Sequence, residues 1–265
     1  QIQEVEEKVH GPQEITEDNF NPEGIVETIV QPGDIWELGN HRLMCGDSTK
    51  PVDVERLMKG DKGEILFTSP PYNVGSLNIP GQEGTQPKYN TPEIPQTQSD
   101  YFQFLINFIE SFKNNVDEVF INLGMVENNK KAIIELLSHY KTPFKDLIFW
   151  NKNTTAPHIQ PGIINNKVEM IIALGDGKRK FKHAQFKQGT YWNVIEGNNA
   201  SSNKLSKIHK ATFPLYLPHN IITNFSNPNS IIIDPFGGTG TTLIACEQLQ
   251  RNCYMMELDP HYCDV

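Results

Sequence analysis

Hydrophobic residues in this chain form short runs, separated in several places by stretches of helical spacing. Apolar residues recur every three to four positions over 101–112, 127–140 and 239–250, which predicts amphipathic helices. Strands that alternate with helices in this way form an α/β sheet that is largely parallel. The runs that we interpret as its buried strands are 65–68, 119–123, 147–150, 168–174, 231–233 and 253–256.

Three segments interrupt this alternation. Residues 1–34 are polar and contain several prolines, so we expect an extended, acidic N-terminal arm outside the core. Residues 74–99 hold four prolines and three glycines, and a loop of this length within a domain is typical of a flexible active-site lid. Residues 176–210 form a basic, irregular insertion. The remainder of 35–265 is expected to be one domain, which begins with a hairpin around Gly39 and Asn40.

The composition excludes several classes of protein. A chain of 265 residues with 37% hydrophobic residues can bury a sizeable core. Its longest apolar runs fall far short of the ~20 residues of a membrane span, and its first residues do not resemble a signal peptide. The four cysteines lack metal-ligand spacing, so we expect reduced thiols, no metal and a cytoplasmic location.

The charge of the chain is distributed unevenly. The formal net charge is −9, from 23 basic and 32 acidic residues, which argues at first against a nucleic-acid partner. Residues 1–37 hold ten acidic residues and one basic residue, so they account for the whole of it. Residues 176–210 hold eight basic and two acidic residues, a local charge of +6. The local charge therefore permits contact with DNA.

A rigid polar loop follows the first predicted core strand. Ser69, Pro70, Pro71 and Tyr72 come directly after residues 65–68, at a strand end that faces the ligand crevice in an α/β fold. Prolines hold the backbone without offering N–H donors, so the loop presents the Ser69 hydroxyl and free carbonyls as acceptors. Acceptors of this kind stabilise the charge that develops on an exocyclic amine, and Tyr72 is suited to stack on a flipped base. A plain proline turn is the alternative.

A glycine-rich loop follows a strand near the end of the chain. The segment 234–242, DPFGGTGTT, joins the strand 231–233 to a helix. It lacks the lysine of a P-loop, and a dinucleotide-binding motif would need glycine where Leu243 stands. A loop for S-adenosylmethionine fits better, because Glu257 closes the next strand, where an acid binds the ribose hydroxyls.

Both motifs together resemble those of the DNA amino-methyltransferases, which methylate adenine N6 or cytosine N4. The segments TSPPYN (68–73) and DPFGGTGTT resemble the catalytic and cofactor motifs, and their order is that of the permuted β group. The resemblance extends over most of 35–265. It implies a Rossmann-like methyltransferase fold with about seven mostly parallel strands, helices on both faces and S-adenosylmethionine as cofactor.

The resemblance also assigns roles by position. Ser69, with Pro70 and Pro71, would orient the target amine, and Tyr72 would stack on the base. Glu257 would bind the ribose, and Asp47 the adenine amino group of the cofactor. The full set expected at the cofactor is Asp47, Thr68, His209, Phe213, Pro214, Asp234, Phe236, Gly237, Gly238, Thr239, Gly240 and Glu257. Because methyl donor and acceptor must meet, Asp234 and Ser69 are expected to lie close together, on neighbouring parallel strands.

The basic insertion lies where the family places its target-recognition region. Its cations would attract phosphates without reading sequence. The DNA-binding residues expected there are Lys178, Arg179, Lys180, Lys182, Lys187, Lys204 and Lys207. An ordinary solvated loop is the alternative.

We therefore expect a site-specific methyltransferase acting on double-stranded DNA. In the family that the motifs resemble, aspartate before the two prolines goes more often with adenine and serine with cytosine, so the resemblance slightly favours cytosine N4 over adenine N6 at Ser69. Two alternatives are methylation of RNA or of a protein glutamine amide, and a DNA-binding module of the same fold without activity. A cognate restriction endonuclease and a homodimer are left open as partners.

Overall fold

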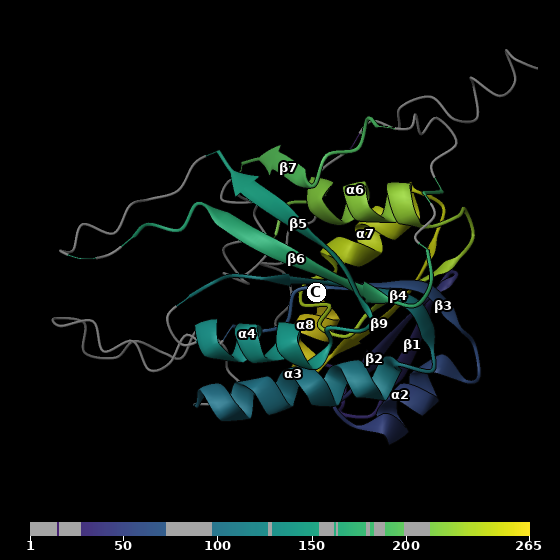
Figure 1. Ribbon diagram of the computed structural model, residues 1–265. Helices are drawn as coiled ribbons and strands as arrows, with labels where there is room; N and C mark the ends of the chain where they lie inside the picture. Colours follow the sequence, from purple (N-terminus) through teal and green to yellow (C-terminus); the bar gives the residue numbers. More distant parts are fainter. Residues whose placement is uncertain are drawn as a thin grey trace, which may run out of the picture.

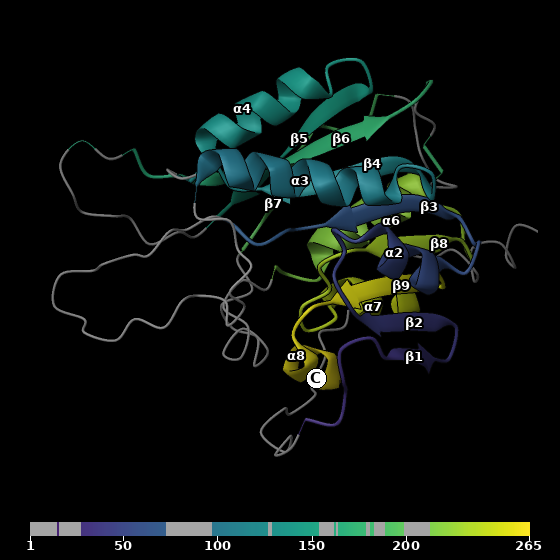
Figure 2. The same cartoon turned by 90° about the horizontal axis from the view of Figure 1, so that it is seen from below.

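Nine strands form a single sheet in the computed structural model (Figure 1). The structure describes Ile15 and residues 28–72, 97–126, 129–153, 162, 164–178, 181–182, 189–198 and 213–265. The sheet order is β1-β2-β9-β8-β3-β4-β6-β5-β7, and most of it can be followed in Figure 2. The strands are β1 (Ile35–Leu38), β2 (His41–Cys45), β3 (Gly63–Thr68), β4 (Val116–Leu123), β5 (Phe144–Lys152), β6 (Val168–Gly175), β7 (Val194–Gly197), β8 (Ile231–Asp234) and β9 (Asn252–Glu257).

Seven of these nine strands run in the same direction. The pairs β2·β9, β9·β8, β8·β3, β3·β4 and β5·β7 are parallel, whereas β6 is antiparallel to both β4 and β5, and β1 to β2. We call the edge where the seven strands end the carboxyl edge, and the opposite one the amino edge. The prediction of about seven mostly parallel strands is confirmed for this set. The short edge strand β7 was not predicted.

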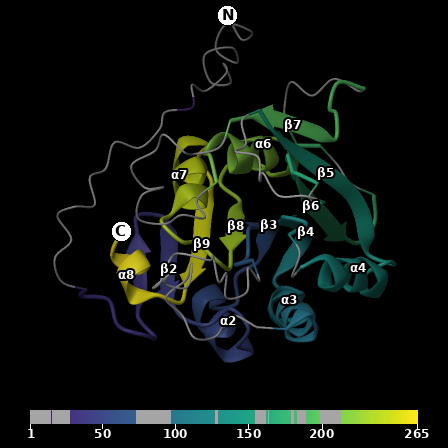
Figure 3. The same cartoon turned by 90° about the vertical axis from the view of Figure 1, so that its left-hand side faces the viewer.

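Helices cover both faces of the sheet (Figure 3). One face packs against α2 (Pro51–Met58), α3 (Gln98–Phe112) and α4 (Lys130–His139). The other packs against α6 (Tyr216–Phe225), α7 (Thr241–Gln248) and the short α8 (Pro260–Asp264). Side chains of each strand alternate between the two cores: in β3, Leu66 faces the α3 side, whereas Ile65 and Phe67 face the α6 side. This two-sided burial explains why the strands read as continuous apolar runs.

Helix α3 begins earlier than its apolar pattern indicates. The Thr97 hydroxyl accepts a hydrogen bond from the Asp100 backbone N–H at 3.1 Å and so caps the helix at Gln98. Residues 97–99, which we assigned to the active-site loop 74–99, therefore belong to the start of α3. The rest of that loop, up to residue 96, lies outside the described residues.

The end of the predicted N-terminal arm is part of the domain. Val30 is 4% exposed and belongs to the core on the α6 side. The backbone N–H groups of Ile29 and Val30 donate to the Asp264 carboxylate at 3.1 and 3.2 Å. Gly33 N–H donates to the Cys45 carbonyl at 2.7 Å. The arm assigned to 1–34 is therefore wrong for 28–34, because a buried valine and backbone hydrogen bonds fix this stretch to β2 and α8.

Strand β7 divides the predicted basic insertion 176–210. Strand β6 runs opposite to β4, so its last residue Gly175 pairs with Glu118 at the amino edge. Strand β7 runs parallel to the last four residues of β5, with Gly197 opposite Lys152 at the carboxyl edge. The two halves of the basic stretch therefore start from opposite edges of the sheet, and a single continuous insertion is the wrong description.

Candidate active site

Four neighbouring strands bring the predicted cofactor residues together at the carboxyl edge. Across the order β2-β9-β8-β3, Asp47 follows β2, Glu257 ends β9, Asp234 ends β8 and Thr68 ends β3. The pairs Cys45↔Glu257, Asp234↔Met255 and Leu66↔Ile233 set this alignment. Parallel neighbours end at the same edge, which is why residues from the two ends of the chain meet here.

Asp234 connects β8, which leads into the glycine loop, to β3, which leads into the Ser69–Tyr72 loop. Its Oδ1 accepts from the Thr68 hydroxyl at 2.7 Å and from the Phe236 N–H at 3.1 Å, and its Oδ2 accepts from the Thr242 hydroxyl at 2.5 Å. Asp234, Thr68 and Thr242 are fully buried. Burial raises the pKa of Asp234, and these three hydrogen bonds offset part of that rise. The expected proximity of β8 and β3 is confirmed. The hydroxyl of Thr68, a residue expected at the cofactor, is directed at Asp234.

The glycine loop is held closely against β9. Gly237 N–H donates to the Met256 carbonyl at 2.8 Å, and a Cβ on Gly237 would lie 2.2 Å from Met255 Cγ. Gly238 and Gly240 have φ of 54° and 85°, a left-handed conformation that favours glycine. Gly240 begins α7, whose first turn contains Thr242. The Phe236 ring packs on Phe108 of α3 at 5.1 Å between centroids and so forms an apolar wall.

Glu257 closes the glycine loop with its carboxylate. Its Oε2 accepts from the Gly238 N–H at 2.8 Å, and its Oε1 from the N–H groups of Leu258 and Asp259 at 2.8 and 2.9 Å. Burial raises the pKa of Glu257 to about 6, although these hydrogen bonds favour the ionised form. The carboxylate therefore changes charge in a mildly acidic range.

The surroundings of Asp47, unlike those of Glu257, favour the ionised carboxylate. Its Oδ1 accepts from the Thr49 N–H and hydroxyl at 2.9 and 2.7 Å, and its Oδ2 lies 3.1 Å from the Lys50 ammonium. Partial burial would raise the pKa of Asp47, but the bonds from Thr49 and Lys50 prevail and lower it. Asp47 and Glu257 thus offer two acidic groups on adjacent strands.

Side chains hold the Ser69–Tyr72 loop, because Pro70 and Pro71 have no N–H. The Ser69 hydroxyl donates to the Asn122 carbonyl at 3.4 Å and accepts from the Asn122 side-chain amide at 3.3 Å. The Tyr72 hydroxyl donates to Glu169 Oε2 at 2.6 Å. Burial, and then the Glu169 charge, raise the pKa of Tyr72 well above its ordinary value, so its hydroxyl keeps the proton.

Three further residues contribute to this site, and none of them is among the site residues expected from the sequence. Asn122 is the penultimate residue of β4, and Glu169 is the second residue of β6. Lys152 ends β5 and forms an ion pair with Glu169. The sequence signal available for Glu169 was a single acid inside an otherwise apolar strand.

The family assignment follows from a comparison with known proteins. The family model described as DNA methylase, for N6/N4 methyltransferases, matches residues 64–265, about three quarters of the chain. The chain belongs to the DNA methylase family. This is the family of the amino-methyltransferases of the N4/N6 type.

Known methyltransferases match the sequence of this chain over different lengths. It is 24% identical to the Type II methyltransferase M.MjaI of Methanocaldococcus jannaschii over 271 residues, which covers 83% of the chain and 88% of that relative. It is 27% identical to the Type II methyltransferase M.SmaI of Serratia marcescens over 135 residues, 44% of the chain and 43% of that relative. The match thus spans less than half of M.SmaI.

Solved structures agree with the fold of the methylase. The cytosine-N4-specific PvuII DNA methyltransferase aligns with a TM-score of 0.62 at 18% identity and 84% coverage of both chains. The complex of M1.HpyAVI with S-adenosylmethionine aligns with a TM-score of 0.60 at 22% identity, covering 84% of this chain and 95% of its own. These neighbours identify the Rossmann-like methyltransferase fold. Among the described residues, no helix has the length and apolarity to cross a membrane.

Other predicted site residues of the methylase lie in different places. Phe213 packs edge-on against Phe67 of β3, with ring centroids 5.7 Å apart. The next residue, Pro214, is buried. Lys178 is exposed just after β6, towards the amino edge. Lys182 pairs with Glu64 at 2.9 Å, close to the start of β3, so it is not at the carboxyl edge. Outside the described residues lie His209, Arg179, Lys180, Lys187, Lys204 and Lys207.

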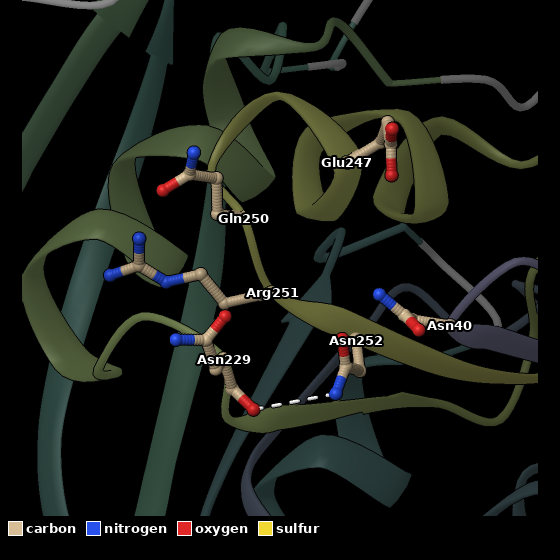
Figure 4. Close-up of a pocket in the computed structure, with 6 residues that line it drawn as sticks. All are labelled: Asn40, Asn229, Glu247, Gln250, Arg251 and Asn252. Carbon is tan, nitrogen blue, oxygen red and sulfur yellow. Dashed lines mark hydrogen bonds between the residues drawn. The ribbon is translucent and has the colours of Figure 1, made fainter.

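A polar pocket of the methylase lies away from this site (Figure 4). Asn252 begins β9, and its side chain donates to the Asn229 carbonyl at 3.4 Å. The pocket is therefore at the amino edge, opposite the carboxyl ends of β8 and β9. The residues that line it are Asn40, Asn229, Glu247, Gln250, Arg251 and Asn252.

Proposed function

We propose that this chain transfers a methyl group from S-adenosylmethionine to the exocyclic amino nitrogen of a flipped-out base in double-stranded DNA. One observation carries this proposal: the catalytic loop and the glycine loop leave adjacent parallel strands, β3 and β8, joined by Thr68 and Asp234. Direct transfer requires donor and acceptor atoms to approach within ~3–3.5 Å. On distant strands, the two motifs could not bring donor and acceptor atoms within this distance.

The residues at the carboxyl edge fit S-adenosylmethionine. Asp47 and Glu257 supply carboxylates for hydroxyl and amino donors, and their negative charge favours a sulfonium cation. Gly240 leaves open space where a side chain would stand, since no atom of the described residues lies within 4 Å of a Cβ built on it. Phe236 adds an apolar surface backed by α3. When bound here, S-adenosylmethionine would supply an electrophilic methyl group on its sulfonium, which becomes a neutral thioether when the methyl group leaves.

The acceptor side of the site suits an amine. The Ser69 hydroxyl and the carbonyls of the proline loop can accept both N–H groups of an exocyclic amine, which localises the nitrogen lone pair for attack. Asn122 Oδ1 is a buried acceptor without a hydrogen-bond partner among the described residues, and such an atom calls for a donor. The acceptors also stabilise the positive charge that forms on nitrogen before the proton is lost.

We place the DNA at the carboxyl edge. Strand β7 ends at Gly197 at this edge, and Phe213 packs against Phe67 of β3. The sequence between them contains Lys204 and Lys207. Its lysines are our candidates for phosphate contacts near the flipped base. Lys178 and Lys182 lie towards the other edge, which argues against a direct role for them at the target base.

Cytosine N4 is slightly preferred over adenine N6 as the target, because Ser69 rather than aspartate precedes the prolines. Expression in a methylation-free host, followed by sequencing of modified bases, tests the base, its position and the motif at once. Unmodified DNA, with labelled methyl found instead in RNA or protein, would replace the proposal by one of the alternatives. A chain that binds cofactor but transfers to nothing would be an inactive module. A cognate endonuclease and a homodimer need separate tests.

A further inference from the structure

Three groups from different strands converge on the Glu169 carboxylate beside the catalytic loop. Tyr72 Oη donates to its Oε2 at 2.6 Å, and the Asn122 amide donates to the same oxygen at 2.7 Å. The Lys152 ammonium pairs with its other oxygen, Oε1. Asn122 comes from β4, Glu169 from β6 and Lys152 from β5, so the carboxylate ties three strands to the loop that follows β3.

The surroundings of this carboxylate make its bonds strong. The side chains of Glu169 and Lys152 are only 12% and 18% exposed, and hydrogen bonds to a charged group in such surroundings exceed those on the surface. Lys152 also lies over the Trp150 ring, 4.7 Å from its centroid, and Trp150 donates to the Tyr216 hydroxyl of α6 at 2.7 Å. The Lys152 ammonium is therefore held both by the Glu169 carboxylate and by the Trp150 ring.

The Tyr72 ring occupies a space shaped for it. A Cβ on Gly124, just after β4, would lie 2.9 Å from Tyr72 Cε2, so only glycine admits the ring here without displacement. Pro70 and Pro71 contribute no N–H to fix the loop. The direction of the ring is set by the Gly124 backbone on one side and by the bond from its hydroxyl to Glu169.

We propose that Glu169 is a positioning residue that holds Tyr72 in the orientation required to stack on the target base. This inference rests on the proposed function and adds a residue to it. Glutamine is a sharp substitute, because its single carbonyl oxygen cannot accept from Tyr72, Asn122 and Lys152 together, while its size is conserved. Loss of one hydrogen bond to a charged group corresponds to roughly a 10- to 100-fold change.

The test compares Glu169→Gln, Tyr72→Phe and the double variant in kcat/KM for methylation of target DNA. Each single variant is expected to fall roughly 10- to 100-fold, and the double variant to fall no further than the worse single, since both act on the bond between Tyr72 and Glu169. Tyr72→Phe also removes the 3.2 Å hydrogen bond that the Asn122 amide donates to the Tyr72 hydroxyl. Cofactor affinity by calorimetry is expected to stay within about twofold of the wild type. A 2-aminopurine at the target position should report altered stacking in both variants.

Glu118→Gln is the matched control. Glu118 of β4 pairs with Lys145 of β5 at 3.7 Å, and both side chains are 11% exposed, but this pair lies at the amino edge. Its variant is expected to leave kcat/KM and the 2-aminopurine signal unchanged. A wild-type rate in Glu169→Gln, or fully additive losses in the double variant, would overturn the inference. The proposed function would still stand in that case, as long as the wild-type chain methylates DNA. If Glu169→Gln fails to fold, an unchanged rate in Tyr72→Phe overturns it instead. A wild-type chain that does not methylate DNA contradicts the proposed function itself.

Discussion

The Thr68 hydroxyl donates a hydrogen bond to Asp234 at 2.7 Å across 166 positions of sequence. Both residues are fully buried, and each ends a strand at the middle of the sheet. The bond therefore fixes the relative height of the two strand ends from which the catalytic loop and the glycine loop depart. It also supplies one of the donors that keep a buried carboxyl group satisfied.

Replacing Thr68 with valine should destabilise the fold. The change keeps the side-chain shape but leaves Asp234 Oδ1 with only the Phe236 N–H, so we expect a loss of about 1–3 kcal/mol in the free energy of unfolding. Urea denaturation measures it. Thr223→Val is the control, because the Thr223 hydroxyl makes only a 3.5 Å contact with His219. Equal stability of the Thr68 variant and the wild type would show that the bond contributes little.

Ser69→Ala and Tyr72→Ala should abolish methyl transfer while cofactor still binds. Ser69 is expected to accept the target amine, and Tyr72 to hold the base, whereas the residues proposed for the cofactor come mainly from the ends of β2, β8 and β9. Labelled-methyl transfer to DNA and calorimetry with S-adenosylmethionine separate the two effects. Full activity in both variants would remove this loop from the catalytic site.

Gly238→Val should weaken cofactor binding by at least about tenfold. At a φ of 54°, valine is strained by roughly 1–3 kcal/mol, and its side chain displaces the backbone N–H that binds Glu257. Gly39→Val is a matched control, because Gly39 has a φ of 63° in the β1–β2 turn, far from the glycine loop in the chain. Both variants should lose stability, but only the Gly238 variant should lose affinity. Unchanged affinity there would exclude the loop from the cofactor site.

Cofactor affinity should fall as the pH drops through about 6. Burial raises the pKa of Glu257 to about 6, and its protonation removes both a hydroxyl acceptor and a negative charge beside the sulfonium. Calorimetry from about pH 8 to about pH 5 should show constant affinity and then a decline. Glu257→Gln should bind more weakly with no such decline. The same decline in that variant would assign the titration to another group.

The same shift has the opposite sign for the stability of the cofactor-free protein. The folded chain favours the protonated Glu257, so its contribution is fully present below 4.5, the ordinary pKa, and is lost as the pH rises through about 6. Cofactor binding and stability should therefore respond to this one carboxyl group in opposite directions. Denaturation curves at several pH values, with and without cofactor, measure both.

The sequence predicted the elements that are buried on two faces. Strands β3, β4, β8 and β9 are apolar because helices cover both sides of them, so their runs could be recognised within two or three residues. Strand β7 has four residues, two of them exposed valine and glutamate, and its pairing with β5 is visible only in three dimensions. Helix α3 begins earlier than its apolar spacing indicates, because the Thr97 side chain caps its N-terminal end.

The site was predictable where a motif is contiguous and not where it is assembled. Ser69–Tyr72 and the glycine loop are each read from adjacent residues, and their meeting followed from the need to bring donor and acceptor together. Asn122, Glu169 and Lys152 come from three strands, and their contacts depend on β6 running antiparallel between β4 and β5. The same reversal of β6 sends Lys178 to the amino edge, which a count of lysines could not reveal.

The pairing of β3 with β8 also bears on how the chain folds. Residues 63–68 lie in the first third of the sequence, but their neighbour in the middle of the sheet is 231–234, close to its end. A growing chain therefore carries one unpaired edge of the apolar strand β3 until β8 has been made. Contacts of such long sequence separation slow folding and prolong the exposure of aggregation-prone edges. The pairing that brings the Ser69–Tyr72 loop beside the glycine loop thus leaves the middle of the sheet incomplete until a strand about 165 positions further along the chain has been made.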